Sequence, residues 1–148
     1  VNGPAIDCIG EELHVAWYTE LGVKPAVYYS VSRNSGLNFE EPQRVDEGES
    51  LGRVDCTILD NGSVAISSME YVENDQNQAD VKIKIFNQLE AKRSMVVGST
   101  SSSRASGFPK IKNAPGDPDA LIVSYTKIYN SELEKSPEVI ISKEDNCK

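Results

Sequence analysis

The sequence predicts an all-β chain made of repeated antiparallel sheets, and three observations support this class. Short apolar runs rich in Val, Ile, Tyr and Ser alternate with polar residues. Gly, Pro, Asn and Asp separate these runs at the spacing of turns. Similar stretches then recur about every 50 residues, which is a period typical of repeat architectures.

Each predicted strand follows from its own pattern. In 80–87, Val81, Ile83 and Ile85 alternate with two lysines, so one face is expected to be buried and the other wet. Asn61-Gly62 lies between two apolar runs and predicts a hairpin. The clearest strand patterns cover 12–19, 25–32, 63–71, 80–87 and 120–127.

The strands group into three units, approximately 1–48, 49–100 and 101–148. Each unit contains a glycine, an apolar strand, a turn and a second strand, as "GPAIDCIGEELHVAWYTE", "GRVDCTILDNGSVAISSME" and "GFPKIKNAPGDPDALIVSYTK" show. Polar loops are expected at 20–25, 72–79 and 128–137, third strands at 26–32, 80–87 and 138–143, and fourth strands at 42–46 and 91–98. The last unit therefore lacks its outer strand.

Four antiparallel strands repeated at this period are typical of the blades of a β-propeller. A sandwich with chance similarity between hairpins remains the alternative. Propellers typically need at least four blades to close, so three units predict half of a larger ring, which we take as the C-terminal half of a six-bladed one. The rest would come from a missing N-terminal half or from a second copy of this chain.

The composition argues against several classes of binding partner. The 148 residues carry a net charge of −8 with a pI near 4.7, which argues against nucleic acid and, weakly, against anionic membranes. No apolar run approaches the length of a membrane span. Cys8, Cys56 and Cys147 have no metal-binding spacing and accompany one histidine, so a metal site is not expected. Cys8 and Cys56 are expected to be buried free thiols.

The segment from Ser32 to Phe39, "SRNSGLNF", fits the pattern S-x-D-x-G-x-T-W. Asn34, Asn38 and Phe39 stand for the Asp, Thr and Trp of the pattern. It thus resembles the Asp-box, or BNR repeat, of the sialidase superfamily, and "GRVDCTILDNGSV" and "SRASGFPKI" are similar to blade openings in bacterial exo-α-sialidase-like proteins. The resemblance implies a sialidase-like propeller that is secreted, periplasmic or attached to the cell surface.

The box itself is expected to be structural. Gly36 can adopt a positive φ at low cost, and Ser32 and Asn34 can bond to neighbouring backbone. Phe39 is expected to pack between adjacent sheets as a hydrophobic pin. The resemblance implies that such boxes lie on the face opposite the active site. Function is then expected at the loops 19–26, 46–53, 70–80, 98–108 and 127–137.

The resemblance also implies three arginines that grip a carboxylate, a tyrosine nucleophile activated by a glutamate, and an acid/base aspartate. The candidates here are Arg53 and Arg104 for substrate binding and Glu70, Tyr71 and Tyr125 for catalysis. A structural role remains the alternative for each of them. The third arginine and the aspartate would lie in a missing half, so the chain is not expected to be catalytically complete alone.

The expected functional loops are acidic, which disfavours an anionic sugar and suits a neutral glycan or a cation. Their acids are Glu20, Asp46, Glu47, Glu49, Glu70, Glu73, Asp75, Asp80, Glu132 and Glu134. The stretch 73–80 carries oxygen ligands suited to Ca²⁺ but without EF-hand spacing, and no cofactor is expected. Two functions stay open: a glycoside hydrolase of exo-α-sialidase type, and a non-catalytic propeller that binds carbohydrate or protein.

Overall fold

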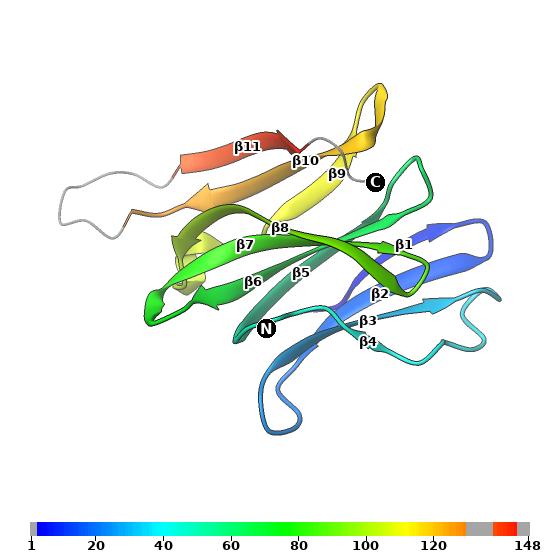
Figure 1. Ribbon diagram of the computed structural model, residues 1–148, viewed down its shortest axis with the longest axis horizontal. Helices are drawn as coiled ribbons and strands as arrows, with labels where there is room; N and C mark the ends of the chain where they lie inside the picture. Colours follow the sequence, from blue (N-terminus) through cyan, green and yellow to red (C-terminus); the bar gives the residue numbers. More distant parts are fainter. Residues whose placement is uncertain (1–2, 130–137, 145–148) are drawn as a thin grey trace.

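The chain folds into three antiparallel β-sheets, as a computed structural model shows for residues 3–129 and 138–144 (Figure 1). In each sheet, neighbouring strands are antiparallel and consecutive in the chain. The sheets are open, and the described residues form no closed ring. The all-β class and its antiparallel sheets are therefore confirmed, and two of the three described sheets have four strands.

The strands have the following bounds. The first sheet contains β1 (Ala5–Ile9), β2 (Glu12–Thr19), β3 (Ala26–Ser32) and β4 (Gln43–Arg44). The second contains β5 (Ser50–Ile58), β6 (Val64–Val72), β7 (Asp75–Asn87) and β8 (Glu90–Ser101). A 3₁₀ turn, η1 (Arg104–Ser106), leads to the third sheet of β9 (Lys110–Ala114), β10 (Asp117–Lys127) and β11 (Glu138–Glu144).

The second sheet departs from the sequence expectation in one loop. The sequence predicts a polar loop over 72–79, but β7 begins at Asp75 and the connection shrinks to a tight turn. Asn74 adopts a positive φ of 65° there, a conformation that asparagine tolerates better than most residues. Cross-strand pairing overrides local polarity here, because the polar residues of 75–80 pair with β6 and β8.

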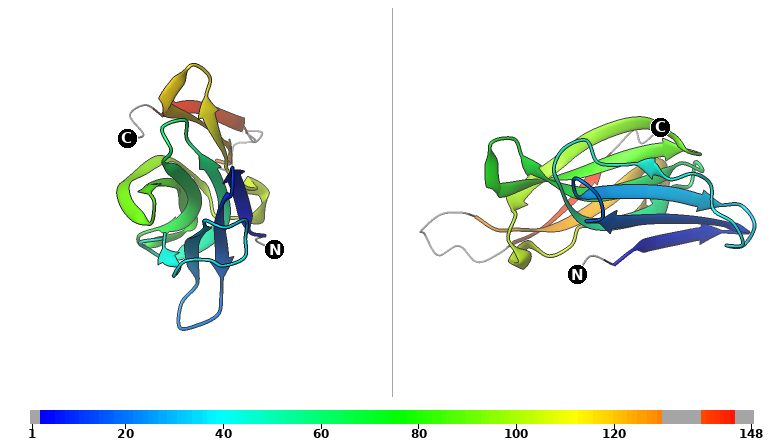
Figure 2. Two further views of the ribbon diagram at one scale, coloured as in Figure 1. Left: turned by 90° about the vertical axis from the view of Figure 1, so that its right-hand side faces the viewer. Right: turned by 90° about the horizontal axis from the view of Figure 1, so that it is seen from below.

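Two apolar layers hold the sheets together, and both involve the second sheet (Figure 2). One lies between the first and second sheets and includes Ala16, Tyr29 and Phe86. The other lies between the second and third sheets and includes Ile83 and Leu121. Alternation along β6 and β7 sends side chains to both layers, so the middle of this sheet is buried on two faces.

A repeated carboxylate contact also joins successive sheets. Asp7 in β1 accepts a hydrogen bond from the backbone N–H of Ile58, at 2.9 Å, and Asp55 in β5 accepts one from the N–H of Ile111, at 3.0 Å. Both donors lie on edge strands, whose outward N–H groups otherwise lack a strand partner. The same Asp-Cys position in two units thus performs the same structural task.

The turn after β3 has the hydrogen bonds expected from its sequence. The Ser32 hydroxyl accepts from the N–H of Gly36 at 2.9 Å, and the Asn34 side-chain oxygen accepts from the N–H of Asn38 at 3.0 Å. Gly36 has φ of +83°, as expected. This turn lies at the end of the sheets that also carries the 10–11 and 59–62 turns, on the right of Figure 1. We call it the turn end.

Two expectations for the first sheet are wrong. Phe39 is not a pin between sheets, because 49% of it is exposed on the face turned away from the second sheet. Cys8 is likewise exposed, whereas Cys56, at the similar position of the second sheet, is buried. Both differences have one cause. The equivalent face of the second sheet, which carries Cys56, packs against the first sheet, whereas the outer face of the first sheet has no neighbour among the described residues. No helix of the described chain is long and apolar enough to cross a bilayer.

Candidate functional site

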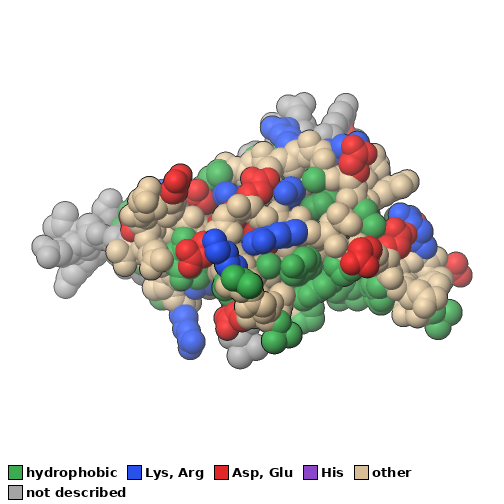
Figure 3. Space-filling view, turned by 60° about the horizontal axis from the view of Figure 1, so that its bottom comes forward, with side chains coloured by type: hydrophobic (Ala, Val, Ile, Leu, Met, Phe, Trp, Pro, Cys, Tyr) green, Lys and Arg blue, Asp and Glu red, His purple; other side chains and the backbone are tan. Residues whose placement is uncertain are grey.

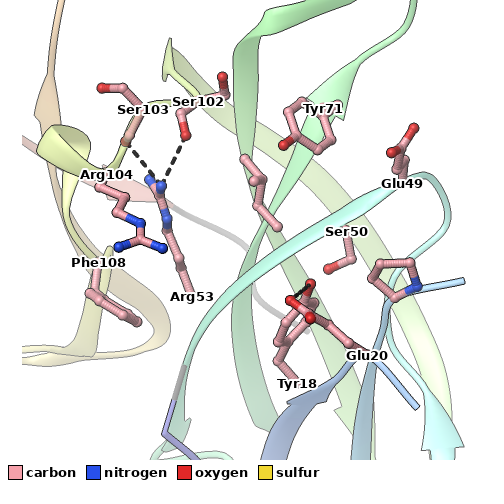
Figure 4. Close-up of a pocket in the computed structure, with 12 residues that line it drawn as sticks. Tyr18, Glu20, Glu49, Ser50, Arg53, Tyr71, Ser102, Ser103, Arg104 and Phe108 are labelled. Carbon is pink, nitrogen blue, oxygen red and sulfur yellow. Dashed lines mark hydrogen bonds between the residues drawn. The ribbon is translucent and has the colours of Figure 1, made fainter. Parts of the chain in front are cut away.

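A cavity of about 670 Å³ opens at the end of the sheets opposite the turn end (Figure 4). Four segments meet there: the loop after β2, the start of β5, the end of β6 and the connection between β8 and β9. Its lining comprises Tyr18, Glu20, Pro25, Glu49, Ser50, Leu51, Arg53, Tyr71, Ser102, Ser103, Arg104 and Phe108. We call it the cavity-end site.

The start of β5 is bent so that it can form the floor of this site. Gly52 and Arg53 have positive φ values of 72° and 55°, and the pairing of β5 with β6 shifts register around them. Tyr18 packs directly on Gly52: a Cβ at this position would lie 2.5 Å from the ring atom Cγ. Glycine is therefore required at position 52 for two reasons: the positive φ of the backbone and the close approach of the Tyr18 ring.

Arg53 anchors the connection between β8 and β9. Its Nη2 donates to the carbonyl oxygens of Ser102 and Ser103, both at 2.9 Å, and its Nη1 donates to the hydroxyl of Ser106. Only 7% of the residue is exposed, and this burial lowers the pKa of Arg53 from its ordinary value. The guanidinium thus ties the second sheet to the segment that carries Arg104.

Arg104 is the exposed arginine of the site. It begins η1, and its carbonyl accepts a hydrogen bond from the N–H of Gly107 at 3.2 Å, which closes the turn. Figure 4 shows its side chain beside that of Arg53 and close to Phe108. A planar guanidinium held here can donate to a hydroxyl or to an anion that enters the cavity.

Aromatic and carboxylate groups form the opposite wall. The Tyr18 hydroxyl donates to Glu20 Oε1 at 3.1 Å, and burial, reinforced by Glu20, raises the pKa of Tyr18 to about 12. Glu49 holds Tyr71 through its backbone, since its carbonyl accepts from the Tyr71 N–H at 2.9 Å. Phe108 exposes 45% of its surface at the rim, on the side of Arg104 (Figure 4). The walls therefore combine ring faces with hydrogen-bond acceptors.

The structure brings Arg53, Tyr71 and Arg104 into this site and leaves the other two candidates outside its lining. Glu70 is 2% exposed and accepts from Gly48 N–H at 2.6 Å and from Lys82 Nζ at 2.9 Å. Successive side chains of a strand point to opposite faces, which separates Glu70 from its neighbour Tyr71.

Tyr125 belongs to the core between the second and third sheets. It is 6% exposed and packs against the backbone at Gly98, where an added Cβ would meet the tyrosine hydroxyl. A phenol in that position cannot reach a ligand in the cavity-end site. Among the described residues, no carboxylate hydrogen-bonds the Tyr71 hydroxyl, and the tyrosine that does pair with a glutamate in this cavity is Tyr18, whose pKa is raised to about 12.

Several lining residues are not candidates from the sequence alone. The sequence places Glu20 and Glu49 only among the acids of the expected functional loops, and it assigns no role to Phe108. Phe108 directly follows Gly107 in a loop that faces the same end as the loop after β2, and this signal could have found it. Tyr18 reaches the site only because Gly52 leaves room for its ring.

The acidic loops are less negative than their composition suggests. Asp46 is buried, accepts from the N–H of Val27 and pairs with Arg44 at 2.6 Å. Glu70 is similarly paired with Lys82. No group of three or more metal-binding side chains suited to a cation occurs in the part of the chain that the structure describes, and 73–80 forms no such group. The loop 130–137, including Glu132 and Glu134, lies outside the described residues.

No protein-family model and no curated protein matches this chain. The functional conclusion therefore depends on the geometry of the site.

Proposed function

We propose that this chain binds a neutral carbohydrate in the cavity-end site and does not hydrolyse it by itself. The observation that carries the proposal is the joint presence of Tyr18, Tyr71 and Phe108 with Glu20 and Glu49 around one cavity. Ring faces offer apolar contact to the C–H face of a sugar. Carboxylates accept hydrogen bonds from its hydroxyls. Seven of the twelve lining residues are polar or charged, so the cavity offers several hydrogen-bonding groups to such a ligand.

The burial of Glu70 and Tyr125 supports binding over catalysis. A hydrolase of the exo-α-sialidase type needs an activated nucleophile in contact with the sugar, and neither of these residues lies where it could act. One observation favours the second candidate function, sialoside recognition or hydrolysis: Arg53 and Arg104 line the same cavity. Arg53, however, already donates to two carbonyls and a hydroxyl of the protein.

On the fold, we propose that the three sheets are successive blades of a sialidase-like β-propeller in an extracytoplasmic protein. The hydrogen-bonded Ser32–Asn38 turn supports this view, as does the repeated contact of Asp7 and Asp55 with the following sheet. Ring closure would require further sheets, from another half of the protein or from a second copy.

Calorimetric titration with neutral oligosaccharides and with a sialylated one tests the proposed function. We expect binding of a neutral sugar, weakened at least tenfold by Phe108→Ala and unchanged by Phe39→Ala. Phe39 is a matched control, because it is similarly exposed at the opposite end of the sheets.

Charge variants decide between the two ligand classes. For a neutral sugar, Glu49→Gln weakens binding because a charged acceptor is lost. For an anionic sugar, Glu49→Gln strengthens binding, and Arg104→Ala abolishes it. Selective binding of the sialylated probe, or its turnover by the isolated chain, would overturn the proposal.

A further inference from the structure

Glu70 carries a buried carboxylate just outside the cavity-end site. It lies in β6, directly before the lining residue Tyr71, and it is almost fully buried. A carboxylate in such a place is costly unless hydrogen bonds and an opposite charge compensate it. Its partners therefore indicate which part of the fold it stabilises.

Three donors compensate the Glu70 carboxylate. Its Oε1 accepts a hydrogen bond from the N–H of Glu47 at 3.2 Å, and its Oε2 accepts one from the N–H of Gly48 at 2.6 Å. Lys82 Nζ donates to the same Oε2 at 2.9 Å. Two consecutive backbone N–H groups thus point at one carboxylate, as they do in the concave sites where backbone binds anions.

The same end of β6 also holds the next residue of this loop. Tyr71 donates its N–H to the carbonyl oxygen of Glu49 at 2.9 Å. Residues 70 and 71 therefore fasten residues 47, 48 and 49 of the loop between β4 and β5. Because the backbone is fixed at Gly48 and at the Glu49 carbonyl, the Glu49 side chain leaves the loop at a defined point.

Gly48 allows the carboxylate to approach this closely. A Cβ at position 48 would lie 2.8 Å from Glu70 Oε2, which is closer than real Cβ atoms come to an oxygen. The contact between the loop and the Glu70 carboxylate therefore requires a residue without a side chain at position 48.

Glu49 lies where its direction matters. It lines the cavity-end site and also two neighbouring hollows of about 660 and 680 Å³. Figure 4 shows it on the same side of the cavity as Tyr71, away from Arg53 and Arg104. An exposed glutamate on an unrestrained loop would divide its time among several rotamers and directions. Fixing its backbone reduces the conformational entropy that is lost when a ligand binds.

Glu49 is also available to a ligand, unlike its neighbour Glu47. The Glu47 carboxylate pairs with Lys84 at 3.1 Å, whereas Glu49 forms no salt bridge within residues 3–129. Figure 3 shows acidic and basic side chains interspersed on one face of the molecule. Local pairing thus compensates the neighbouring acids and leaves the Glu49 carboxylate to accept hydrogen bonds in the cavity.

We propose that Glu70 is a positioning residue of the cavity-end site, which holds Glu49 where its carboxylate meets the hydroxyls of a bound sugar. The identity of the ligand rests on the proposed function, whereas the ordering of the loop by Glu70 can be measured without a ligand. Glu70 then acts through Glu49, from outside the cavity, and does not contact the sugar.

Amide hydrogen exchange in the ligand-free protein tests the ordering of the loop. Glu70→Gln keeps the shape of the side chain but replaces one acceptor oxygen by an NH₂ group, which cannot accept a hydrogen bond. Exchange at the amides of Glu47 and Gly48 should rise about tenfold or more, since a hydrogen bond to a charged group is lost. Unchanged exchange at both amides would overturn the proposal, whether or not the protein binds sugar.

Asp7→Asn is the matched control for a general loss of stability. The Asp7 carboxylate also accepts from a backbone N–H, that of Ile58 at 2.9 Å, and from the Thr57 hydroxyl at 3.3 Å. It does not line the cavity-end site. This variant should leave both the exchange of the loop amides and sugar binding as in the parent.

Calorimetric titration with a neutral oligosaccharide tests whether Glu70 acts through Glu49. Glu70→Gln should weaken binding about tenfold in the parent and have little further effect in a Glu49→Ala background. Gly48→Ala displaces the loop from an intact Glu70 and should weaken binding in the same way, so it carries the test if Glu70→Gln does not fold.

Two outcomes of the titration separate this proposal from the proposed function. Equal weakening by Glu70→Gln with and without the Glu49 side chain would show a general structural effect and would overturn the positioning role. A parent that binds no neutral oligosaccharide would overturn the proposed function, and the exchange at Glu47 and Gly48 would still decide whether Glu70 orders the loop.

Discussion

Replacement of Gly52, which lies in β5 under the Tyr18 ring, by alanine should destabilise the protein more than a glycine-to-alanine change at an open turn. Gly52 has φ of +72°, and the left-handed conformation costs an L-residue about 1–2 kcal/mol. The new Cβ would also lie 2.5, 2.7 and 2.8 Å from three atoms of Tyr18. Because one of these is the Tyr18 Cβ, rotation of the ring alone cannot relieve the clash. Overpacking of this kind costs about 1–3 kcal/mol.

The expected loss is therefore about 2–5 kcal/mol, a large part of the roughly 5–15 kcal/mol that keeps a domain folded. Urea unfolding followed by circular dichroism measures it. Gly62→Ala is the matched control, since Gly62 has φ of +83° but a Cβ added there would meet no atom within 4 Å. The Gly62→Ala variant should therefore lose only the free energy that the left-handed backbone conformation costs an alanine. Equal losses for the two variants would refute the contribution of the Tyr18 contact.

Buried groups give three further predictions. Arg53→Ala should lower the free energy of unfolding by about 3 kcal/mol, because charge-assisted hydrogen bonds to two carbonyls are lost. Amide hydrogen exchange should then rise selectively in residues 102–106, and unchanged exchange there would contradict the anchoring role of Arg53. Burial lowers the pKa of His14, so the contribution of the neutral imidazole to stability is present above pH 6.5 and is lost as the pH falls through the folded-state pKa. NMR can follow this one histidine, and a folded-state pKa above 6.5 would contradict the prediction. Burial raises the pKa of Cys56 to about 12, whereas Cys8 is exposed. In a Cys147→Ser variant, a thiol reagent should therefore label Cys8 within minutes and Cys56 only on unfolding. Rapid labelling of both thiols in the native protein would contradict this prediction.

Local signals predict the strands and turns of this protein well. The strand 12–19 is found with the expected bounds, because its alternating pattern matches one buried and one partly exposed face. The turn at Ser32–Asn38 forms as expected, since its hydrogen bonds join residues only a few positions apart. The loop 72–79 fails as a prediction because strand pairing extends through polar residues that look like a loop.

The site could be predicted only in part. Arg53, Tyr71 and Arg104 lie together because sheet topology places their segments at one end, and topology follows from strand order. Whether a side chain points into the cavity depends on one-residue alternation and on bulges, which explains why Tyr71 lines it and the adjacent Glu70 is buried elsewhere. Arg53 donates to carbonyls from the 102–103 segment, about 50 positions away in the chain.

The sequence by itself determined the all-β class, the order of the strands and the turn at 32–39, because these depend on local periodicity and on short-range hydrogen bonds. Only the tertiary structure decided which faces are covered. Cys8 and Cys56 have similar local sequences, but one is exposed and the other buried, and Phe39 is exposed although its motif suggests burial. Burial depends on the neighbour that a sheet meets, and that neighbour is set by packing between segments far apart in the chain.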